Sequence, residues 1–412
     1  MNKKSNSNSN IKIKKTNYLY WFIYSTASKI YQKLIYGLKC NDKEFKEKCK
    51  KSGAIVVYNH VSNKDHFTST ASFKNRHAHY VITKHFYFNK FLSHFLNNVS
   101  AIPKDQFSAD MASIKLMKRA TDDNHIVAIA PAGQVSVHGG MIFIDEGIVK
   151  LVRLCKTDVF ALQIRGNYLA HPKWSLSKRR AKVRTKFVHV IDKNEIKELS
   201  DEEIYQRICN SIDISDIREQ KENKIKIKGK SRALGIENIL YVCPKCRSEF
   251  KITSSGHYFW CEECGNKIYF DQYGLMNPAS DNNIMFENEE EWYKWENNLL
   301  LNEIKNNNLH IENEMTMYRN YNDEWKMEEF ATGKLTLTNE TFIFDGKDLN
   351  GKQYHKEFAL ERIFQLPWKP NSHFEINGDE DGKFKFISKI QPNIVVKYVQ
   401  AIDALRIYKN KK

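Results

Sequence analysis

Short β-rich runs alternate with helical patterns between residues 54 and 190, and this alternation constrains the fold more than any other feature of the sequence. The runs that favour strands lie at 54–58, 79–83, 99–103, 125–130 and 158–164. The stretches 88–96 and 108–120 have helical patterns, and in the second the apolar stripe consists of Met111, Ile114, Leu116 and Met117. Such alternation predicts an α/β domain in which helices flank a layered mixed sheet.

The N-terminal region combines basic and aromatic residues. Residues 1–16 read as a disordered basic tail, and the polar start MNKKSNSNSN lacks the apolar stretch of a signal peptide. The apolar run YLYWFIY at 18–24 is far shorter than the roughly 20 residues that cross a bilayer. Its basic, amphipathic setting favours an interfacial membrane helix within residues 1–39, and a helix packed on the protein's own core is the alternative.

The excess of basic over acidic residues favours an anionic partner. The net charge is +16 and the pI is near 9.2, which suits phosphorylated substrates, an anionic membrane surface or nucleic acid. Seven basic side chains lie within residues 173–186, where a solvated strand pair and a face that meets phosphates both fit the pattern. A charged helix is expected at 201–211, followed by a lysine-rich linker at 220–232.

Eight cysteines fall into two groups. Four are scattered and read as small, often buried residues: Cys40, Cys49, Cys155 and Cys209. The other four form the pattern C-x2-C-x14-C-x2-C: Cys243, Cys246, Cys261 and Cys264. Two such knuckles bring four thiolates to one tetrahedral site, so residues 233–275 are expected to form a zinc ribbon around a structural zinc ion. A ribbon without metal and an iron–sulfur site are the alternatives. Two disulfides fit poorly, because the scattered thiols and the missing signal peptide suggest a reducing cytosol.

The last part of the chain, residues 285–412, changes from helix to strands and back to helix. An acidic amphipathic helix is expected at 288–305, with one face formed by Trp292, Trp295, Leu299 and Ile304. Residues 333–346 alternate with period two and predict a turn at Asp345-Gly346, and further strands are expected at 373–377 and 382–389. A final helix has apolar residues at helical spacing: Val395, Val399, Ile402 and Leu405. This layout resembles an α+β domain of the pleckstrin-homology or GRAM-like type, a class that often binds lipid or protein.

The stretch AIVVYNHVSNKD at 54–65 places a histidine at the end of an expected strand and an aspartate five residues later. In a continuous helix His60 and Asp65 would lie about 140° apart, so a strand end, a turn and a helix start are needed to bring them together. An imidazole that donates one N–H to a carboxylate presents its other nitrogen as a base. Such a pair can take the proton from an alcohol as that alcohol attacks an acyl carbonyl.

The order and spacing of four segments resemble the glycerol-phosphate and lysophosphatidate acyltransferase family over residues 40–275. NH-x4-D at 59–65 is similar to the first family motif, and VSAIPKDQ at 99–106 occupies the place of the second. HIVAIAPAGQVS at 125–136 stands where the family has an F-P-E-G-T-R-S-like segment, and DVFALQIRG at 158–166 resembles the apolar fourth motif. The acyltransferase domain is therefore expected at 40–232, and the cysteine module after it is similar to one bacterial branch of the family.

The resemblance implies that His60 is the general base and that Asp65 orients it. Family members move an acyl chain from acyl-CoA or acyl-carrier protein to the hydroxyl of a lysophospholipid or glycerol phosphate, without a covalent enzyme intermediate. A hydrophobic groove for the chain and a cationic site for the acceptor's phosphate are therefore expected. So is a peripheral position on the cytoplasmic face of an anionic membrane.

The third segment departs from the family pattern. Ala132 stands at the family's glutamate and Val135 at its arginine, which usually helps to grip phosphate. Gly133 and Ser136 remain, and both are expected to contact the acceptor's phosphate. Glycine lets the backbone approach a ligand closely, but a plain turn explains Gly133 equally well.

Replacement cations for the missing arginine lie in neighbouring segments. Lys104 in the second segment and Lys84 in YVITKH are the expected phosphate contacts, and His138 is a further candidate. Lysine supplies charge but lacks the forked geometry of arginine, so affinity for phosphate is expected to survive with less orientation.

Two other functions remain open on the sequence alone. A nucleic-acid-binding zinc-ribbon protein would use the net charge, but the segment between the cysteine pairs carries few basic residues, among them Lys251. No nucleic acid is therefore expected as a partner. A non-catalytic lipid-binding scaffold would keep the fold and lose turnover through the altered third segment.

Overall fold

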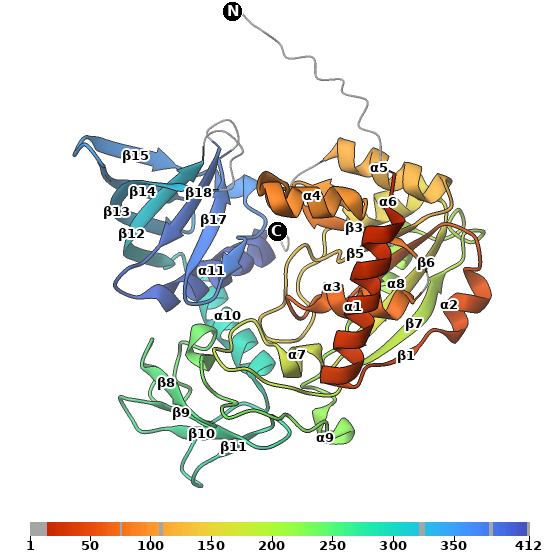
Figure 1. The fold of residues 1–412 in the computed structure, drawn as a ribbon. Helices are drawn as coiled ribbons and strands as arrows, with labels where there is room; N and C mark the ends of the chain where they lie inside the picture. The colour runs from red at the N-terminus through yellow and green to blue at the C-terminus, as the bar shows by residue number, and fades with distance from the viewer. Residues whose placement is uncertain (1–14, 75, 107–109, 321–325, 379–381, 410–412) are drawn as a thin grey trace, which may run out of the picture.

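The computed structural model describes residues 15–74, 76–106, 110–320, 326–378 and 382–409 (Figure 1). Within these residues the chain forms a seven-stranded sheet, a four-stranded sheet and a second seven-stranded sheet, in that order along the sequence. Helices accompany the first and the third sheet (Figure 1). The mixed α/β architecture expected from the sequence is therefore present, and the basic tail expected at residues 1–16 lies mostly outside the described residues.

The first sheet has the strand order β1-β7-β6-β2-β5-β3-β4. Its strands are β1 Lys39–Asn41, β2 Ala54–Tyr58, β3 Ala78–Thr83, β4 Ile102–Lys104, β5 Ile126–Ile129, β6 Asp158–Arg165 and β7 Arg184–Ile191. Strands β6, β2, β5, β3 and β4 run parallel, and β7 pairs antiparallel with β6. Because the carboxyl ends of parallel strands meet at one edge, the loops after β2, β3, β4, β5 and β6 gather there.

Helices cover both faces of this sheet. They are α1 Tyr18–Tyr36, α2 Lys43–Lys48, α3 Asp65–Phe73, α4 Lys90–Asn98, α5 Met111–Asp122, α6 Gly147–Cys155, α7 Asn167–Ala170, α8 Asp201–Ile212 and α9 Gln220–Asn223, with a short 3-10 helix η1 at Lys84–Phe88. Alternate residues of β2 point to opposite faces. Ile55 and Val57 pack with α5, α6 and α8, whereas Val56 packs with α1, α2 and α3. Of the stripe expected on α5, Leu116 and Met117 are buried, but Met111 is exposed.

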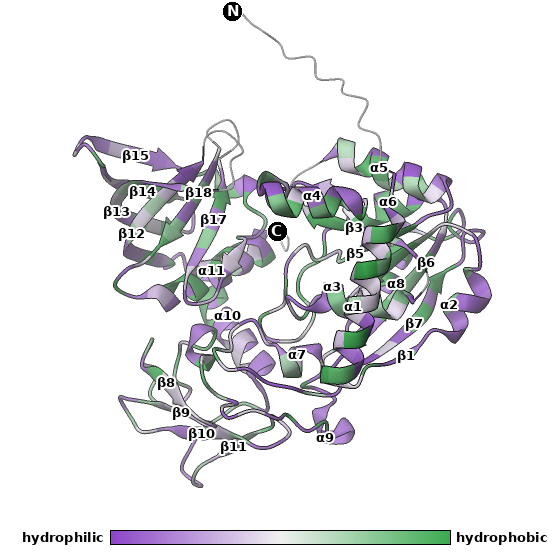
Figure 2. Cartoon of the chain, viewed as in Figure 1, coloured by the Kyte–Doolittle hydropathy of each residue, from purple (hydrophilic) through white to green (hydrophobic). Residues whose placement is uncertain are grey.

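Helix α1 packs on the protein with one face and exposes an apolar face on the other. Trp21 is buried against the core around β2. The exposed apolar residues are Tyr18, Leu19, Phe22, Ile23, Ile30, Leu34 and Ile35, and Figure 2 shows hydrophobic segments along this helix. Among the described residues, none of the helices combines the length and the hydrophobicity that crossing a bilayer requires.

The basic segment 173–186 is not a solvated strand pair, so that interpretation was wrong. Regular strand begins only at Arg184, and upstream of it Arg180 forms an isolated bridge with Lys228. Arg179 is buried, and its guanidinium lies 4.6 Å from the ring centroid of Trp174. The alternation of charges in the sequence did not reveal that this stretch is an irregular segment with a buried cation.

The four-stranded sheet contains the cysteine module. Its strands are β8 Ile252–Ser255, β9 Tyr258–Cys261, β10 Lys267–Phe270 and β11 Met276–Pro278, preceded by a 3-10 turn η2 at Ile236–Asn238. All neighbouring strands are antiparallel, in the order β11-β10-β9-β8. The last strand ends three residues beyond the boundary expected at 275.

The second seven-stranded sheet is antiparallel throughout, in the order β15-β14-β13-β12-β18-β17-β16. Its strands are β12 His310–Asn320, β13 Glu328–Thr338, β14 Phe342–Asp348, β15 Gln353–Glu357, β16 Trp368–Lys369, β17 His373–Asn377 and β18 Lys383–Ile387, with short 3-10 turns η3 at Leu360–Arg362 and η5 at Pro392–Ile394. Helix α10, Glu289–Lys305, precedes the sheet, and α11, Val395–Lys409, follows it.

The turn predicted at Asp345-Gly346 is wrong, because both residues lie inside β14. The chain reverses earlier, between Thr338 and Thr341, where the Thr338 N–H donates to the Thr341 carbonyl at 2.9 Å. Gly346 pairs with Gly333 of β13, and a Cβ at either position would overlap the neighbouring backbone. The Asp-Gly dipeptide therefore allows close strand approach here and does not mark a turn.

Helix α10 connects the four-stranded sheet with its cysteine module, called the ribbon below, to the C-terminal sheet (Figure 1). All three share one hydrophobic core. The Glu296 carboxylate is fully buried and accepts the backbone N–H groups of Tyr241 and Val242 at 2.7 and 2.8 Å. Trp292 donates its ring N–H to the Val242 carbonyl at 3.0 Å. The ribbon is thus fixed to α10 by buried hydrogen bonds.

Candidate active site

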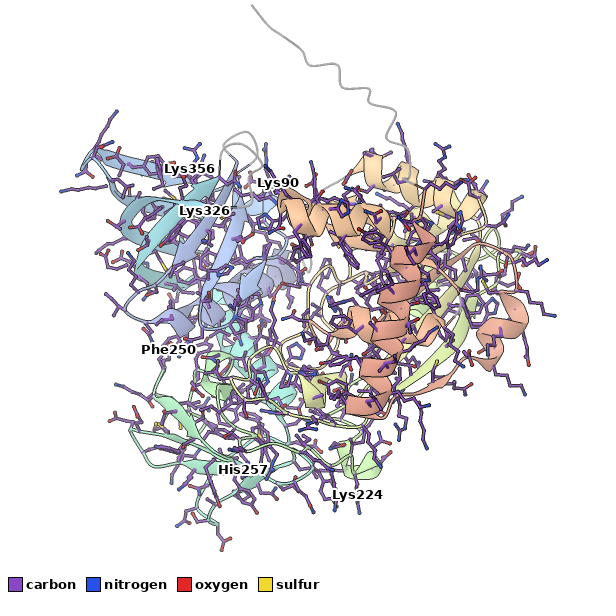
Figure 3. All side chains as sticks on the ribbon, viewed as in Figure 1. Lys90, Lys224, Phe250, His257, Lys326 and Lys356 are labelled. Carbon is purple, nitrogen blue, oxygen red and sulfur yellow. The ribbon has the colours of Figure 1, made fainter. Side chains whose placement is uncertain are left out.

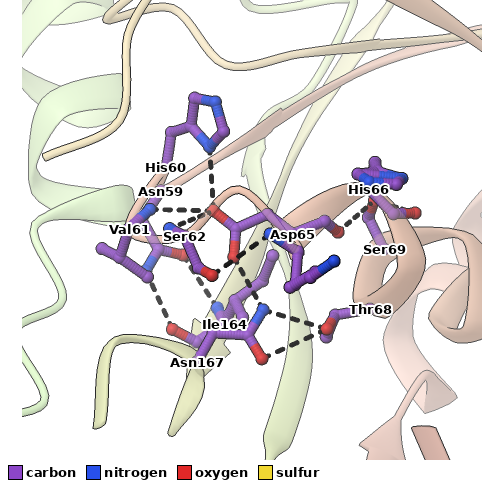
Figure 4. Close-up of polar contacts among 11 residues, drawn as sticks. Asn59, His60, Val61, Ser62, Asp65, His66, Thr68, Ser69, Ile164 and Asn167 are labelled. Atoms are coloured by element: carbon purple, nitrogen blue, oxygen red, sulfur yellow. Dashed lines mark hydrogen bonds and ion pairs between the residues drawn. The ribbon is translucent and has the colours of Figure 1, made fainter. Parts of the chain in front are cut away.

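His60 lies directly after β2, at the edge of the sheet where the parallel strands end. The preceding residue fixes this position: Asn59 donates to the Ile164 carbonyl of β6 and accepts the Ile164 N–H, both at 2.8 Å. His60 Nδ1 lies 2.8 Å from Asp65 Oδ2 (Figure 4). The strand end, turn and helix start expected from the sequence bring these two side chains together.

The Asp65 carboxylate is completely buried at the first residue of α3 and is surrounded by donors. Oδ2 accepts the backbone N–H groups of Val61 and Ser62 at 2.8 and 2.9 Å in addition to the imidazole. Oδ1 accepts the side-chain N–H of Asn167 at 2.7 Å (Figure 4). These bonds hold the carboxylate in one orientation.

The geometry assigns the proton positions on His60. A carboxylate only accepts hydrogen bonds, so Nδ1 carries the proton that bonds to Asp65 and Nε2 is the acceptor nitrogen. The His60 side chain is about a quarter exposed, whereas that of Asp65 is inaccessible. An imidazole in this state can accept a proton from a bound hydroxyl, and the buried carboxylate stabilises the imidazolium that results.

Asn167 is part of this arrangement, and the sequence analysis missed it. It begins α7 directly after β6, and it also exchanges hydrogen bonds with Thr68 at 2.9 and 3.2 Å. Because β6 is the neighbour of β2, the loops after the two strands meet. A polar residue soon after the strand 158–164 was the only signal available, and it does not single out one asparagine.

A narrow recess opens beside His60. It is lined by residues of β2 and the following turn, of the third segment and its loop, and of the chain after α8: Tyr58, Asn59, His60, Val61, Ala132, Ser136, Gly140, Met141, Ile142, Ile144, Ile212 and Ile214. Its volume is about 20 Å³, which has room for about one water molecule. Most of the lining is apolar, and its residues include no lysine or arginine. An acyl chain suits this lining but enters only if the walls move apart.

The third segment is tied to His60 through the backbone. The Ser136 N–H donates to the His60 carbonyl at 2.8 Å, and the buried Ser136 hydroxyl accepts the Gly139 N–H at 3.2 Å. Gly133 has φ +70°, and its carbonyl accepts the side-chain N–H of Gln106 at 2.5 Å. Val135 is buried, at the place where the family has an arginine.

The expected phosphate cations lie farther along the same edge. Lys84 follows β3 and forms an ion pair with Asp105 at 3.4 Å, and Lys104 at the end of β4 donates to the Asp105 carbonyl at 3.1 Å. Strands β3 and β4 are two and three positions from β2, which corresponds to roughly 10 and 14 Å at the usual strand spacing. The two lysines therefore lie together, at some distance from His60.

His138 is not a replacement cation, so that expectation was wrong. The residue is completely buried, and burial lowers the pKa of its imidazole to about 4. Its Nδ1 accepts the Gly140 N–H at 3.2 Å, and its ring centroid lies 4.9 Å from that of Tyr293. The imidazole is therefore neutral near pH 7.

The C-terminal sheet adds two lysines that the sequence analysis did not connect with this edge. Burial lowers the pKa of His85 in η1, and the charges of Lys383 and Lys385 on β18 lower it further. These ammonium groups therefore lie near η1 and close to Lys84. No local pattern in the sequence could have placed a strand 300 residues later beside this segment.

Four thiols of the ribbon are placed to hold one metal ion. The sulfurs of Cys243 and Cys264, and those of Cys246 and Cys261, are each 3.7 Å apart, and all four lie within 4.8 Å of one another. A tetrahedral zinc ion with Zn–S bonds of about 2.3 Å requires sulfurs about 3.8 Å apart. Disulfides, with S–S near 2.05 Å, are excluded at these distances. The geometry fits a four-thiolate site.

A second group with metal-ligand side chains comprises Asp158, His189 and Asp192. Here Lys48 donates to His189 Nδ1 at 2.7 Å, so His189 donates its other N–H to Asp158 at 3.3 Å. The nitrogen that faces the carboxylates, Nε2, is therefore engaged by Asp158. We interpret this group as a structural hydrogen-bonded cluster.

Comparison with known proteins finds a match to one family over part of the first domain. Residues 38–165 match the family model described as Acyltransferase. No curated protein matches the chain. Among solved structures the chain is similar to the 1-acyl-sn-glycerophosphate (LPA) acyltransferase PlsC from Thermotoga maritima, with 13% identity and a TM-score of 0.38. That alignment covers 46% of this chain and 76% of the other.

Proposed function

We propose, from the premise that residues 38–165 belong to the acyltransferase family, that this protein transfers a fatty acyl group to a glycerolipid acceptor. The donor is a thioester, acyl-CoA or acyl-carrier protein, and the acceptor is the hydroxyl of a lysophospholipid or glycerol phosphate. One observation carries the proposal: the 2.8 Å contact between His60 Nδ1 and Asp65 Oδ2 beside an apolar recess.

The reaction follows from the proton positions on His60. Nε2 takes the proton of the acceptor hydroxyl while the hydroxyl oxygen attacks the thioester carbonyl. The tetrahedral intermediate collapses with cleavage of the C–S bond, and the imidazolium returns its proton to the departing thiolate. The products are an ester and a free thiol, and His60 is neutral again. Asp65 stabilises the imidazolium throughout and never needs to be protonated itself.

Lys84 and Lys104 are the side chains we propose for the acceptor's phosphate, with Gly133 and Ser136 nearer to His60. In the free protein Lys84 pairs with the Asp105 carboxylate, whereas Lys104 donates to the Asp105 backbone carbonyl. A dianionic phosphate would compete with that carboxylate for Lys84. The separation of the lysines from β2 suits a phosphate that lies apart from the reacting hydroxyl.

We infer that the protein binds peripherally to the cytoplasmic face of an anionic membrane through the exposed face of α1. Leu34 is 75% exposed on α1 and Phe91 is 82% exposed on α4, although both are large and apolar. Lys15, Lys33 and Lys90 are exposed near these residues in sequence, and Figure 3 shows Lys90 at the start of α4. Apolar side chains beside lysines suit an interface with anionic lipid. Sedimentation with anionic and with zwitterionic vesicles tests this, and Phe22→Glu should reduce binding to the former.

We propose zinc as the metal of the four-thiolate site, with a structural role. All four ligands come from the protein, so no coordination position is left for a substrate. For the C-terminal unit, the antiparallel sheet closed by α11 supports the pleckstrin-homology or GRAM-like assignment, and lipid or protein is its proposed ligand class.

The decisive experiment measures acyl transfer by the purified full chain from labelled acyl-CoA to a panel of lysophospholipids and glycerol phosphate. His60→Ala should lower kcat by about 10³-fold, because the general base is lost. His310→Ala, at an exposed histidine far along the chain, is the matched control and should leave kcat unchanged. Equal activity of both variants would remove His60 from the mechanism. Lipid binding without turnover in the unmodified protein would favour the scaffold function.

A further inference from the structure

The loop after the third segment forms one wall of the recess beside His60. We call residues 138–144 the wall segment. Four of its members, Gly140, Met141, Ile142 and Ile144, line the recess, and Ile212 and Ile214 of a second segment line it as well. Both segments belong to the first α/β domain, but each also contacts helix α10 of the C-terminal unit.

Helix α10 contacts the wall segment at Gly140. A Cβ at this position would overlap the Glu290 carboxylate, so the carboxylate occupies the space above the glycine backbone. The neighbouring His138 ring packs against Tyr293, one turn farther along the same helix. Only glycine fits at position 140 while α10 keeps this position.

The same carboxylate also contacts the second segment that lines the recess. Ser215, directly after Ile214, donates its hydroxyl to Glu290 Oε2 at 3.0 Å. Arg218 Nε lies 3.3 Å from the same oxygen, and Lys294 Nζ lies 2.8 Å from Oε1. The Glu290 side chain is only 2% exposed, so it cannot replace these partners with water if it moves. One side chain of α10 therefore links both walls.

Two further contacts fix the far end of the wall segment. The Arg406 guanidinium of α11 lies 3.9 Å from the ring centroid of Phe143. The Tyr205 hydroxyl of α8 donates to the Ile144 carbonyl at 2.8 Å. The C-terminal unit thus contacts the wall segment at both ends, and it fixes a recess that now holds about one water molecule.

We propose that Glu290 is a positioning residue that sets the length of acyl chain the recess accepts. This inference rests on the proposed function, since it concerns the recess in which that function places the acyl chain. Opening the recess separates its walls, and each wall is tied to Glu290. A firm link restricts opening and favours short chains, whereas a loosened link admits longer ones.

The test compares kcat/KM for palmitoyl-CoA and octanoyl-CoA in matched variants. Glu290→Gln keeps the shape and the bond to Ser215 but loses both ion pairs, so the palmitoyl-to-octanoyl ratio should rise about tenfold. The change should lie mainly in KM for the donor, because His60 and Asp65 are untouched. Glu291→Gln is the control: its carboxylate is 45% exposed and contacts only Lys294, at 3.1 Å.

Gly140→Ala disturbs the same link from the wall segment. The added methyl group overlaps the Glu290 carboxylate and displaces it from its partners. The palmitoyl-to-octanoyl ratio should then rise, as it does in Glu290→Gln. Ser215→Ala, which removes one hydrogen bond to Glu290, should raise the ratio by less than Glu290→Gln does.

Hydrogen–deuterium exchange of residues 138–144 gives a readout that does not depend on activity. Exchange should accelerate in Glu290→Gln and stay unchanged in Glu291→Gln, at equal Tm. If exchange does not accelerate, Glu290 does not position the wall segment and the inference is wrong. If it accelerates but the ratio stays constant, the link to chain length is wrong. If the unmodified protein transfers neither chain, the proposed function fails, while exchange still decides the positioning role.

Discussion

Two regions beside His60 are built in different ways: the carboxylate of Asp65 on one side and the wall segment on the other. Asp65 has two short-range partners, Val61 and Ser62, within four residues of it, and one distant partner, Asn167 of α7, which follows the adjacent strand β6. The wall segment depends on Glu290 and Arg406, which lie about 150 and more than 260 residues farther along the chain.

We therefore expect the two regions to control different properties, the rate of the chemical step on the Asp65 side and the choice of substrate on the side of the wall segment. The histidine–aspartate pair is complete within the first α/β domain, because its donors come from the turn between β2 and α3 and from α7. The segment that lines the recess is in addition contacted by α10 and α11. A change in the ribbon or in the C-terminal unit is therefore expected to alter which substrate binds, and a change near Asp65 is expected to alter the rate of the chemical step.

The largest expected effect is on kcat and follows from a change at the Asp65 carboxylate. Asp65→Asn keeps the size of the side chain but offers a neutral amide to the imidazole, which then loses its fixed tautomer and its stabilising charge. We expect kcat to fall by about 10³-fold, no more than for His60→Ala, with the palmitoyl-to-octanoyl ratio of kcat/KM unchanged. Single-turnover measurements with two donor lengths check this. A loss below tenfold would show that the pair is not the base.

The next largest effect is expected from a change at the four-thiolate site, which shares a hydrophobic core with α10. Cys261→Ser removes one ligand of the four-thiolate site, and we expect it to lower the free energy of unfolding by about 4 kcal/mol. Because the ribbon and α10 share a core, exchange of the wall segment should accelerate too. Metal analysis and thermal unfolding with and without a chelator measure both. Cys40→Ser, at a half-buried thiol outside the site, should leave metal content and Tm unchanged.

A smaller effect is expected at Asn167. Asn167→Ala removes the donor to Asp65 Oδ1 and leaves Thr68 without its amide partner. The cost should be about 1.5–3 kcal/mol, seen as a lower kcat and a lower Tm. The palmitoyl-to-octanoyl ratio of kcat/KM should stay unchanged. A shift in that ratio without a change in kcat would contradict the separation of the two regions.

The smallest expected effect is a pH dependence of the free energy of unfolding, caused by Glu289 of α10. Burial raises the pKa of Glu289 to about 7, and its carboxylate accepts the Tyr168 hydroxyl at 3.0 Å. In the unfolded chain this carboxyl loses its proton at a lower pH. The folded state therefore binds more protons between the two pKa values, and its stability falls as pH rises toward and through 7.

Glu289→Gln should remove this dependence. Relative to the unmodified protein, the variant should gain about 1–2 kcal/mol between pH 5 and pH 8. Denaturant unfolding at the two pH values measures the gain. An equal stability difference at both values would show that the carboxyl titrates normally.

Local patterns were enough to predict much of the framework. Strands β2 and β17 begin and end where the alternating and apolar runs do, and the cysteine spacing predicted sulfurs that converge. The missed elements are of another kind: β1 has three residues, and β7 lies within a highly charged stretch. Such strands form because a neighbouring strand offers hydrogen-bond partners, which a single run of residues does not encode.

The residues of the candidate site also divide into those that local sequence patterns predict and those that depend on distant contacts. His60 and Asp65 were predictable because a turn of a few residues has few ways to close. Asn167 and Glu290 were not, because their roles depend on which loops meet at the sheet edge and on where α10 packs. His138 was misread as a cation, since the burial that keeps it neutral is not visible in its sequence neighbours.

The sequence by itself determined the α/β alternation, the four converging thiols and the pairing of an imidazole with a carboxylate across one turn. Each depends on residues close together in the chain, where covalent geometry leaves few choices. Only the tertiary structure decided that a glutamate of α10 packs over Gly140 and that α10 and α11 contact the segment that lines the recess beside His60. Those contacts join segments about 75 to 260 residues apart, and packing of separate cores, not local geometry, sets where they meet.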